Sequence, residues 1–298
     1  MSGEKPRNDL PLIIGLFAIN MFWGASFIAN DIALRSILPI EIASLRFFIA
    51  APLLAALALL WKGPGIFRME KNDLPAIIVM AVTGVTLQYI LQVTAQSYTT
   101  AINLSLILNL STFFILFLGA LFLGERLTAS RVIGAFVGFG GVALLVSGGT
   151  LAFSLGQVGD AVAVFCALLW AVYSIVGKKI AGKYHPLAIL VWVFAIGAVC
   201  MMPFYVLTPH GGLSIIPVSA WGAILFLAVF CSIIAYLVYN LALETMDASQ
   251  VALFIYLIPL ATIILSWVIL GKGLTLASGF GGLLVLAGMW IAERNTRK

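Results

Sequence analysis

The side chains best suited to chemistry in this sequence are amides and aromatic rings placed at helical spacing within apolar segments. Gln88, Gln92 and Gln96 recur every four residues with Tyr89 beside them, so the three amides share one face of a helix. Amides and hydroxyls hydrogen-bond ammonium and carboxylate groups, while rings pack against an apolar side chain or attract a cation. Such a face favours the binding of a zwitterion that carries an apolar side chain.

Comparable faces occur in four other apolar segments. Together the candidate cavity residues are Asn20, Trp23, Phe27, Gln88, Tyr89, Gln92, Asn109, Trp170, Tyr173, Tyr236, Tyr239 and Asn240. Neutral polar groups inside apolar helices also join neighbouring helices, a role worth about 0.6 kcal/mol per hydrogen bond in membranes. That alternative stays open for each residue taken alone, whereas several faces that mix amides with rings indicate a shared cavity.

A single arginine lies deep within one of the apolar segments. Arg46 comes seven residues after Pro39, which places it roughly 10 Å from the segment's end if the segment is helical. A charge at that depth costs at least about 2.5–3.5 kcal/mol unless a partner or water satisfies it. Two interpretations remain open. Arg46 pairs with a helix end or with Asp31 or Glu41 nearby, or it meets the carboxylate of a bound substrate.

The amino-acid composition indicates that these segments lie in a lipid bilayer and not in water. Hydrophobic residues make up 63% of the 298 and charged residues only 9%, far from the soluble range. A membrane-spanning helix needs about 20 apolar residues, because the hydrocarbon core is roughly 30 Å thick. Open sheets cannot survive in lipid, and the runs lack the alternation of a barrel. The sequence therefore predicts an all-α polytopic membrane protein with ten transmembrane helices, at residues 11–31, 39–61, 74–96, 101–122, 130–147, 158–179, 186–207, 219–241, 248–270 and 275–292.

Motifs of common enzymes are missing from the sequence. It contains no GxxxxGK[ST], HExxH or GxSxG, which argues against an ATPase, a metalloprotease or a serine hydrolase. Cys166, Cys200 and Cys231 lie within predicted spans and lack the spacing of a disulfide framework or a metal site. No carboxylate falls at mid-span, which leaves proton coupling without an obvious carrier. We expect no catalytic residue, no cofactor and no metal.

Basic residues are distributed unevenly between the predicted loops. With a cytoplasmic N-terminus, 13 of the 16 Lys and Arg residues fall in segments on the cytoplasmic side. This bias is the positive-inside pattern, and it places both termini in the cytoplasm. The net charge of +5 then reflects topology and contact with anionic lipid, and nucleic acid is not an expected partner.

An internal duplication organises the chain. A shift of 147 residues carries Trp23 onto Trp170, Tyr89 onto Tyr236 and the motif at 121–141 onto 268–288. Each copy holds five predicted spans, an odd number, so the second copy enters the membrane upside down, as in many secondary transporters. The predicted boundaries are a cytoplasmic tail at 1–10, a first five-helix repeat at 11–148, an outer linker at 149–157, a second repeat at 158–293 and a basic cytoplasmic tail at 294–298.

Glycines mark the last span of each copy. Gly134, Gly138 and Gly141 lie on one face of the fifth span, and Gly281 and Gly288 lie on one face of the tenth. Faces of small residues let two helices approach closely in a membrane. The sequence leaves open whether that contact forms within one protomer or across a homodimer.

Several short motifs recur in order along nearly the whole chain. They are Trp23-Gly24-Ala25-Ser26-Phe27, Pro39 with Arg46-Phe47, Leu123-Gly124-Glu125, Gly159-Asp160 and an LxP…LG pattern at Leu257–Gly271. With these motifs the chain resembles the drug/metabolite transporter superfamily in its ten-helix form with two EamA domains, and within it the YddG-type exporters of aromatic amino acids. Two positions depart from the pattern. Thr112 stands where a proline is expected, and Lys272 stands where the first copy has Glu125.

The resemblance implies a secondary transporter of the bacterial inner membrane that exports neutral hydrophobic or aromatic amino acids and related small metabolites by alternating access. The expected partners are a small-molecule substrate and the lipid bilayer, and the protein is a monomer or a homodimer. Other neutral metabolites or drugs, such as nucleosides and amphipathic compounds, form the first alternative. A non-transporting intramembrane enzyme or scaffold is a weaker alternative, because no nucleophile–base pair is visible and a scaffold does not require an inverted repeat with polar inner faces.

Overall fold

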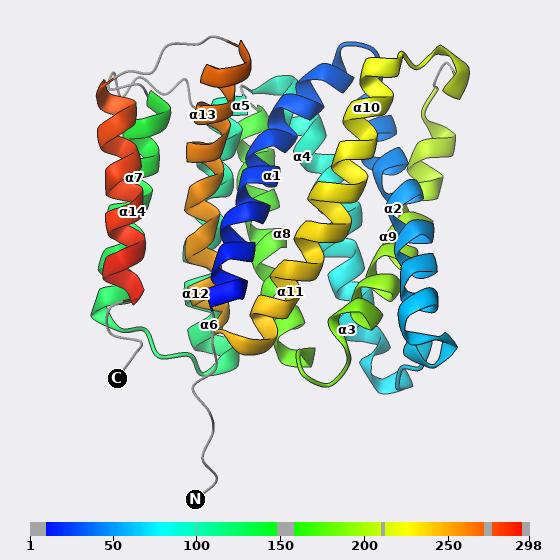
Figure 1. The fold of residues 1–298 in the computed structure, drawn as a ribbon, viewed down its shortest axis with the longest axis horizontal. Coiled ribbons are helices and arrows are strands. Elements are labelled where there is room, and N and C mark those ends of the chain that lie inside the picture. Colours follow the sequence, from blue (N-terminus) through cyan, green and yellow to red (C-terminus); the bar gives the residue numbers. More distant parts are fainter. Residues whose placement is uncertain (1–9, 100, 148–157, 210–211, 271–275, 294–298) are drawn as a thin grey trace, which may run out of the picture.

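The computed structural model describes residues 10–99, 101–147, 158–209, 212–270 and 276–293, and this part of the chain is a bundle of helices (Figure 1). The first copy contains α1 (Leu10–Leu34), α2 (Pro39–Lys62), α3 (Leu74–Ala81), η3 (Val82–Thr86), α4 (Leu87–Tyr98), α5 (Ala101–Leu108), α6 (Leu110–Leu123) and α7 (Ala129–Ser147). The second contains α8 (Val158–Ile180), α9 (Pro186–Leu207), α10 (Val218–Phe226), η5 (Leu227–Ile234), α11 (Ala235–Thr245), α12 (Ala248–Leu253), η6 (Phe254–Tyr256), α13 (Leu257–Leu270) and α14 (Leu276–Glu293). Short 3₁₀ turns lie in loops at η1 (Pro64–Phe67), η2 (Lys71–Asp73) and η4 (Leu213–Ile215).

Within the described ranges, ten apolar helical segments run through the bundle. Eight of them are at least 18 residues long and apolar enough to span a membrane. Two are shorter, at Ala129–Leu145 of α7 and Gly279–Ala292 of α14. Large apolar side chains such as Leu60, Phe136 and Val268 are exposed on the outside, as expected for a surface that faces lipid tails. The prediction of an all-α membrane protein with ten spans is confirmed.

The two copies run in opposite directions through the bundle. α1 begins and α14 ends at the same end, the lower one in Figure 1. We call this end the terminal face and the other end the opposite face. Each helix of the first copy is antiparallel to its mate in the second, so that α2 runs toward the terminal face while α9 runs away from it. This is the inverted-topology arrangement of two five-helix repeats.

Contacts between helices follow the same two-fold relation. α2 packs against its own mate α9, and α7 packs against its own mate α14. Several other contacts between the copies come in related pairs. α1 packs against α13 and α11, while its mate α8 packs against α6 and α4. The pseudo-two-fold axis therefore passes between α2 and α9 and between α7 and α14, the two pairs of mates that are in contact.

The second helix of each copy starts at the same place because its first proline repeats, although different side chains cap the two starts. Pro39 and Pro186 are mates, and each occupies the first turn of its helix, where a missing N–H costs nothing. The Leu38 N–H donates to the Glu41 carboxylate at 2.8 Å, and the Leu187 N–H donates to His185 Nδ1 at 3.2 Å. Both caps satisfy backbone groups that a helix leaves unpaired at its start.

Both third spans of the copies contain a π-helix at the same place. A shift of 147 residues takes η3, at 82–86, onto 229–233 within η5. A π-helix widens the turn and releases backbone carbonyls from the regular hydrogen-bond ladder, and such insertions occur frequently at functional sites. Gly84 and Cys231 are mates in these two segments, and both carbonyls accept hydrogen bonds from side chains of distant helices.

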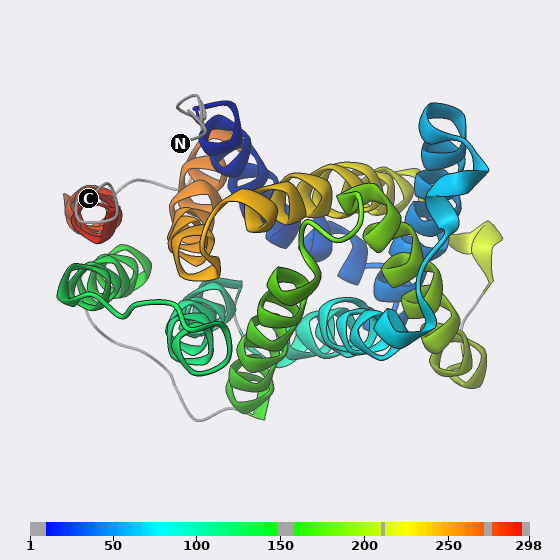
Figure 2. The same cartoon turned by 90° about the horizontal axis from the view of Figure 1, so that it is seen from below.

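Glycines bring α7 and α14 into close contact at one edge of the bundle (Figure 2). A methyl group added at Gly141 would lie 2.6 Å from the Val285 nitrogen, and one added at Gly134 would lie 2.5 Å from the Gly288 oxygen. No side chain fits between these backbones. The glycine contact left open by the sequence therefore forms within the protomer.

Candidate functional site

The main cavity lies where the two copies meet, beside α1 and α8. It encloses about 570 Å³ of empty space, including the part open to solvent. Its lining comes from α1, α4, α5, α6, α8, η6 and α13. The lining residues are Trp23, Ser26, Phe27, Gln88, Tyr89, Gln92, Ser105, Leu108, Asn109, Ser111, Trp170, Ile255 and Ile258. In secondary transporters built from inverted repeats, the substrate site lies where the two repeats meet, as this cavity does.

Close packing of α1 places its two rings on the cavity. A methyl group added at Gly24 would lie 2.5 Å from the Ala261 Cβ, so the absence of a side chain lets α1 contact α13 directly. Trp23 and Phe27 flank this contact on α1 and line the cavity. The Trp23 indole is held in place because Nε1 donates to the Cys231 carbonyl at 3.0 Å. The motif around Gly24 therefore positions two rings of the site.

An aromatic cluster closes the cavity toward the terminal face. The Trp23 and Trp170 rings meet edge to face with centroids 5.4 Å apart, and Tyr239 lies 5.1 Å from Trp170 and 5.7 Å from Trp23. Tyr173 stacks on Trp170 at 5.1 Å, and Tyr236 meets Trp170 at 5.6 Å. All five side chains are buried. Pairs of rings in these geometries are worth roughly 0.5–1.5 kcal/mol each beyond their burial.

Hydrogen bonds lock the tyrosines of this cluster. Tyr239 pairs with the Ser174 hydroxyl at 2.7 Å, and Asn240 donates to the Tyr173 hydroxyl at 2.7 Å. The Tyr236 hydroxyl donates to the Gly84 carbonyl of η3. It also lies 3.2 Å from the hydroxyl of Tyr89, its mate. The terminal half of the site is thereby packed and hydrogen-bonded, and the empty volume lies on the other side of Trp23 and Trp170.

Two amide oxygens at the cavity are buried without a hydrogen-bond partner in the described part of the chain. Gln88 donates through Nε2 to Gln92 Oε1 at 3.2 Å, which leaves Gln88 Oε1 unpaired. Asn109 donates through Nδ2 to the Ser105 carbonyl at 2.5 Å, which leaves Asn109 Oδ1 unpaired. A buried unpaired acceptor costs roughly 1–3 kcal/mol, so both oxygens are suited to accept from the N–H groups of a ligand.

Arg46 lies directly behind the cavity wall. Its guanidinium carbon stands 4.0 Å from the centroid of the Tyr89 ring, and Tyr89 is a lining residue. The guanidinium donates through Nε to the Ser232 hydroxyl at 2.6 Å and through Nη2 to the Cys231 carbonyl at 3.0 Å. The side chain is only 2% exposed. The π-helix η5 thus supplies the carbonyl that satisfies this cation.

The two carboxylates expected near Arg46 have other partners. Asp31 accepts from Gln96 at 2.6 Å, and Glu41 accepts from the backbone at Leu38. Among the described residues no ion pair involves Arg46, so its charge is balanced by neutral dipoles and a ring. Asp31 and Glu41, two of the partners left open by the sequence, therefore do not pair with Arg46, whose donors meet the Ser232 hydroxyl and the Cys231 carbonyl instead.

Seven of the thirteen predicted site residues line the cavity: Trp23, Phe27, Gln88, Tyr89, Gln92, Asn109 and Trp170. The other six lie around it. Tyr173, Tyr236, Tyr239 and Asn240 belong to the aromatic cluster, Arg46 lies behind Tyr89, and the buried Asn20 donates to the Leu16 carbonyl of its own helix. Gln96, the third amide of the stripe, joins α4 to α1 by donating to the Phe27 carbonyl at 3.1 Å.

Ser105, on the same helical face as the candidate Asn109, also lines the cavity, and the sequence analysis missed five further lining residues: Ser26, Leu108, Ser111, Ile255 and Ile258. Serine and aliphatic residues within apolar spans carry little signal on their own. The duplication does contain a signal, because Leu108 and Ile255 are mates, as are Ser111 and Ile258. Positions that line a site on a two-fold axis are expected to appear in both copies.

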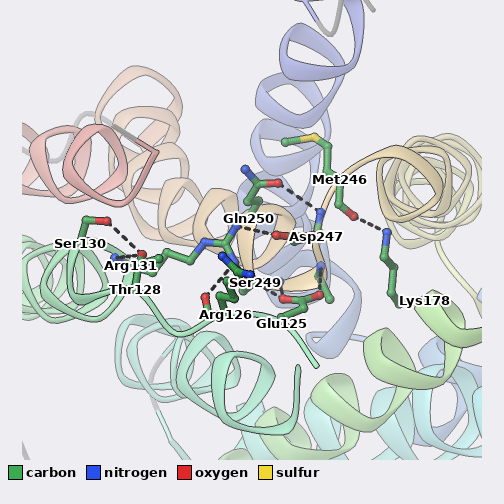
Figure 3. Close-up of polar contacts among 11 residues, drawn as sticks. Glu125, Arg126, Thr128, Ser130, Arg131, Lys178, Met246, Asp247, Ser249 and Gln250 are labelled. Carbon is green, nitrogen blue, oxygen red and sulfur yellow. Dashed lines mark hydrogen bonds and ion pairs between the residues drawn. The ribbon is translucent and has the colours of Figure 1, made fainter. Parts of the chain in front are cut away.

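A polar network joins the copies at the terminal face (Figure 3). The Glu125 carboxylate, near the start of the loop that follows α6, accepts from the backbone N–H groups of Ala248 at 2.7 Å and Ser249 at 3.1 Å. It also accepts from the Ser249 hydroxyl at 2.5 Å. Arg131 of α7 is buried and forms a salt bridge with Asp247 at 2.5 Å. We call Glu125, Arg131, Asp247 and Ser249 the terminal latch.

The terminal latch has no chemical equivalent in the mated positions. Shifting Glu125, Arg131, Asp247 and Ser249 by 147 residues gives Lys272, Ser278, Thr100 and Ile102. Carboxylate contacts with the start of a helix are favourable, since the helix dipole adds to the hydrogen bonds. The copies are therefore joined by a charged network at the terminal face, and in the sequence the mated residues do not carry the same charges.

Comparisons with known proteins identify the family. The sequence model of the EamA-like transporter family matches residues 10–147 and, a second time, residues 157–293. The chain belongs to the EamA-like transporter family. A transporter of Archaeoglobus fulgidus is 34% identical to this EamA-like chain over 279 residues, which cover 93% of the chain and 95% of the relative.

Two further similarities extend over almost the whole EamA-like chain. A protein of Streptantibioticus cattleyicolor, named "Probable terminal-alkyne amino-acid exporter", is 26% identical over 276 residues, which cover 92% of this chain and 90% of the relative. A crystal structure of another protein shares the fold with a TM-score of 0.81 at 19% identity, covering 97% of this chain and 98% of the other. The family match over both halves of the chain, with the transporter from Archaeoglobus fulgidus, shows a multi-pass membrane transporter of the drug/metabolite transporter superfamily rather than an enzyme.

Proposed function

We propose that this EamA-like transporter exports neutral amino acids with apolar or aromatic side chains across the bacterial inner membrane by alternating access. The observation that carries the proposal is the composition of the cavity. Gln88 and Asn109 each present an unpaired oxygen, Arg46 lies behind Tyr89, and the Trp23 and Trp170 rings complete the wall. An α-amino acid combines an ammonium group, a carboxylate and a side chain, and each finds a complementary group here.

The electrostatics favour a zwitterion over a cation or a multiply charged anion. The amide oxygens of Gln88 and Asn109 accept from an ammonium group, and the buried Arg46 guanidinium makes the region around Tyr89 favourable for a carboxylate. A nucleotide or sugar phosphate would place several anionic oxygens near one guanidinium, which is too few partners for a buried phosphate. The relative from Streptantibioticus cattleyicolor, named as an amino-acid exporter, supports the same substrate class.

Counterflow into liposomes that contain the purified protein tests the proposal. Vesicles preloaded with unlabelled Phe, Leu, Val or Trp are expected to accumulate the labelled amino acid transiently, because exchange at an alternating-access site requires only substrate on both sides. Nucleosides, cationic dyes and sugar phosphates serve as comparison substrates. Counterflow of nucleosides or dyes in the absence of any amino-acid counterflow would contradict the proposal and favour the alternative class of neutral metabolites or drugs.

Asn109→Leu is expected to weaken the binding of all amino-acid substrates to a similar degree. The substitution keeps the side chain's size and removes Oδ1, which we place against the ammonium group. A hydrogen bond to a charged group is worth about 1.5–3 kcal/mol, so half-saturation of counterflow should rise about 10- to 100-fold for Phe, Leu and Val. Asn20→Leu is the matched control, since Asn20 also bonds the carbonyl of its own helix but lies outside the lining. Equal effects of the two substitutions would contradict the role of Asn109.

We also propose that the terminal face is cytoplasmic, with the N-terminus and the C-terminus inside. The excess of Lys and Arg in the loops on that side supports this orientation. Single cysteines at Asn72 and Arg126, in a variant whose native cysteines are replaced by alanine, should not react with a membrane-impermeant thiol reagent in intact cells. A cysteine at Gly156 should react. Labelling of Asn72 and protection of Gly156 would show the reverse orientation.

A further inference from the structure

The two copies contribute different chemistry to the cavity. Every amide and hydroxyl side chain in the lining comes from the first copy: Ser26, Gln88, Tyr89, Gln92, Ser105, Asn109 and Ser111. The second copy contributes Trp170, Ile255 and Ile258. Apart from the indole N–H of Trp170, this wall offers no side-chain hydrogen bond among the described lining residues. The cavity therefore has a polar wall from the first copy, to which Trp23, Phe27 and Leu108 add apolar contacts, and an apolar wall from the second copy.

The contrast is sharpest at positions that are mates. Ser111 and Ile258 occupy the same place in their copies, at the start of the second half of the fourth and ninth spans, and both line the cavity. One presents a hydroxyl and the other a branched hydrocarbon. Leu108 and Ile255 are also mates and line the cavity, and both are apolar. Ser111 and Ile258 therefore occupy equivalent backbone positions and differ only in the side chain that they present to the cavity.

Three pairs of mates line the cavity with both members: Trp23 with Trp170, Leu108 with Ile255, and Ser111 with Ile258. Alternating access between inverted repeats exchanges the conformations of the two copies. When the copies exchange conformations, each residue takes the position that its mate held before. Because both members of these three pairs line the cavity, all six residues still line it in the other facing state. Gln88, Gln92 and Asn109 differ in this respect, because their mates Ala235, Tyr239 and Tyr256 are buried away from the cavity.

We infer that Ile255 and Ile258 form the subsite for the substrate's side chain and select against polar side chains in both facing states. This inference rests on the proposed amino-acid substrate. A side chain that carries a hydroxyl or an amide would lose its hydrogen bonds to water against these two isoleucines without gaining others. An apolar side chain gains by leaving water, at about 25 cal/mol per Å² of buried surface. The substrate's charged groups then lie toward the polar wall of the first copy.

Val and Thr are the sharpest probes, because they have the same shape and differ by one hydroxyl. In liposomes that contain the full-length protein, counterflow of Val should exceed that of Thr. Ile258→Ser gives the second copy the residue that the first copy has at position 111. The ratio of Val to Thr counterflow should then fall about tenfold, within the roughly 100-fold that a purely apolar pocket achieves against an added hydroxyl. Ile258→Thr, which keeps the branched shape, should lower the ratio in the same direction.

Ile264→Ser is the matched control. It makes the same substitution on α13, but Ile264 is 38% exposed on the outside of the bundle, so the ratio should stay at the wild-type value. Elution as a single species in size-exclusion chromatography shows that each variant is folded. If the wild-type protein exchanges Val and Thr, and both Ile258→Ser and Ile258→Thr keep the wild-type ratio of Val to Thr counterflow, the proposed side-chain subsite is wrong. Wild-type protein that exchanges no amino acid would instead overturn the proposed function.

Discussion

Gly288→Leu is expected to abolish the accumulation of folded protein. A Cβ at this position would lie 2.6 Å from the Gly134 oxygen and still closer to the Gly138 backbone nitrogen. Backbone atoms cannot move aside as a side-chain tip can, so α14 would have to separate from α7 over the whole contact. Overpacking by a few methylene groups costs about 1–3 kcal/mol in a core whose side chains can relax. Here the clash is with backbone atoms, so the cost in stability should be larger. Fluorescence-detected size-exclusion chromatography of detergent extracts measures the loss.

Gly140→Leu is the control for this prediction. Gly140 lies on α7 beside the contact face, and a Cβ added there meets no atom within 4 Å. The substitution adds the same side chain to the same helix pair, but on a surface that faces lipid. We expect normal yield and an unchanged elution volume. A Gly288→Leu protein that accumulates as well as Gly140→Leu would show that α7 and α14 do not pack through these glycines.

Glu125→Ala is expected to open the terminal face. The substitution removes the acceptor of three hydrogen bonds, from Ala248 N, Ser249 N and Ser249 Oγ. Hydrogen bonds to a charged group contribute about 1.5–3 kcal/mol, and every 1.4 kcal/mol is about a tenfold change in an equilibrium. Even the loss of one such bond should therefore shift the population toward the state open at the terminal face by about tenfold or more.

Ser174 is the position at which to measure this opening. It is buried and bonded to Tyr239 in this structure, whereas its mate Phe27 lines the cavity. Exchange of the two conformations should bring Ser174 to the surface of a cavity open at the terminal face. Ser174→Cys, in a protein whose native cysteines are replaced by alanine, should react with a thiol reagent at least about tenfold faster when Glu125→Ala is added.

Glu70→Ala serves as the control for the terminal latch. Glu70 lies in a loop at the same face and pairs with Lys183 at 2.9 Å, but its side chain is exposed. An exposed ion pair is worth about 0–1 kcal/mol, so the labelling rate at Ser174→Cys should stay near its starting value. Equal labelling in the two variants would show that Glu125 does not hold the terminal face closed.

Properties that depend on local pattern were determined by the sequence. The apolar length of each segment is set by the thickness of a bilayer, so the ten spans could be predicted without knowledge of packing. The constant shift of 147 residues, with an odd number of spans per copy, required the inverted repeat. The same shift paired Trp23 with Trp170, whose rings do meet at 5.4 Å. Pro39 and Pro186 marked helix starts, because proline suits a first turn in any context.

Other features depend on how helices distant in sequence pack, and only the tertiary structure decided them. Arg46 is satisfied by the Cys231 carbonyl, which is available because η5 is a π-helix, and nothing local in either segment predicts that contact. Gln92 lines the cavity while Gln96, one turn later on the same face, joins α4 to α1. Two copies with one sequence pattern adopt different conformations around the site, so mates such as Asn109 and Tyr256 have different surroundings. A periodic pattern identifies the face of a helix that turns inward, but the neighbour at each point of that face is set by the packing of the whole bundle.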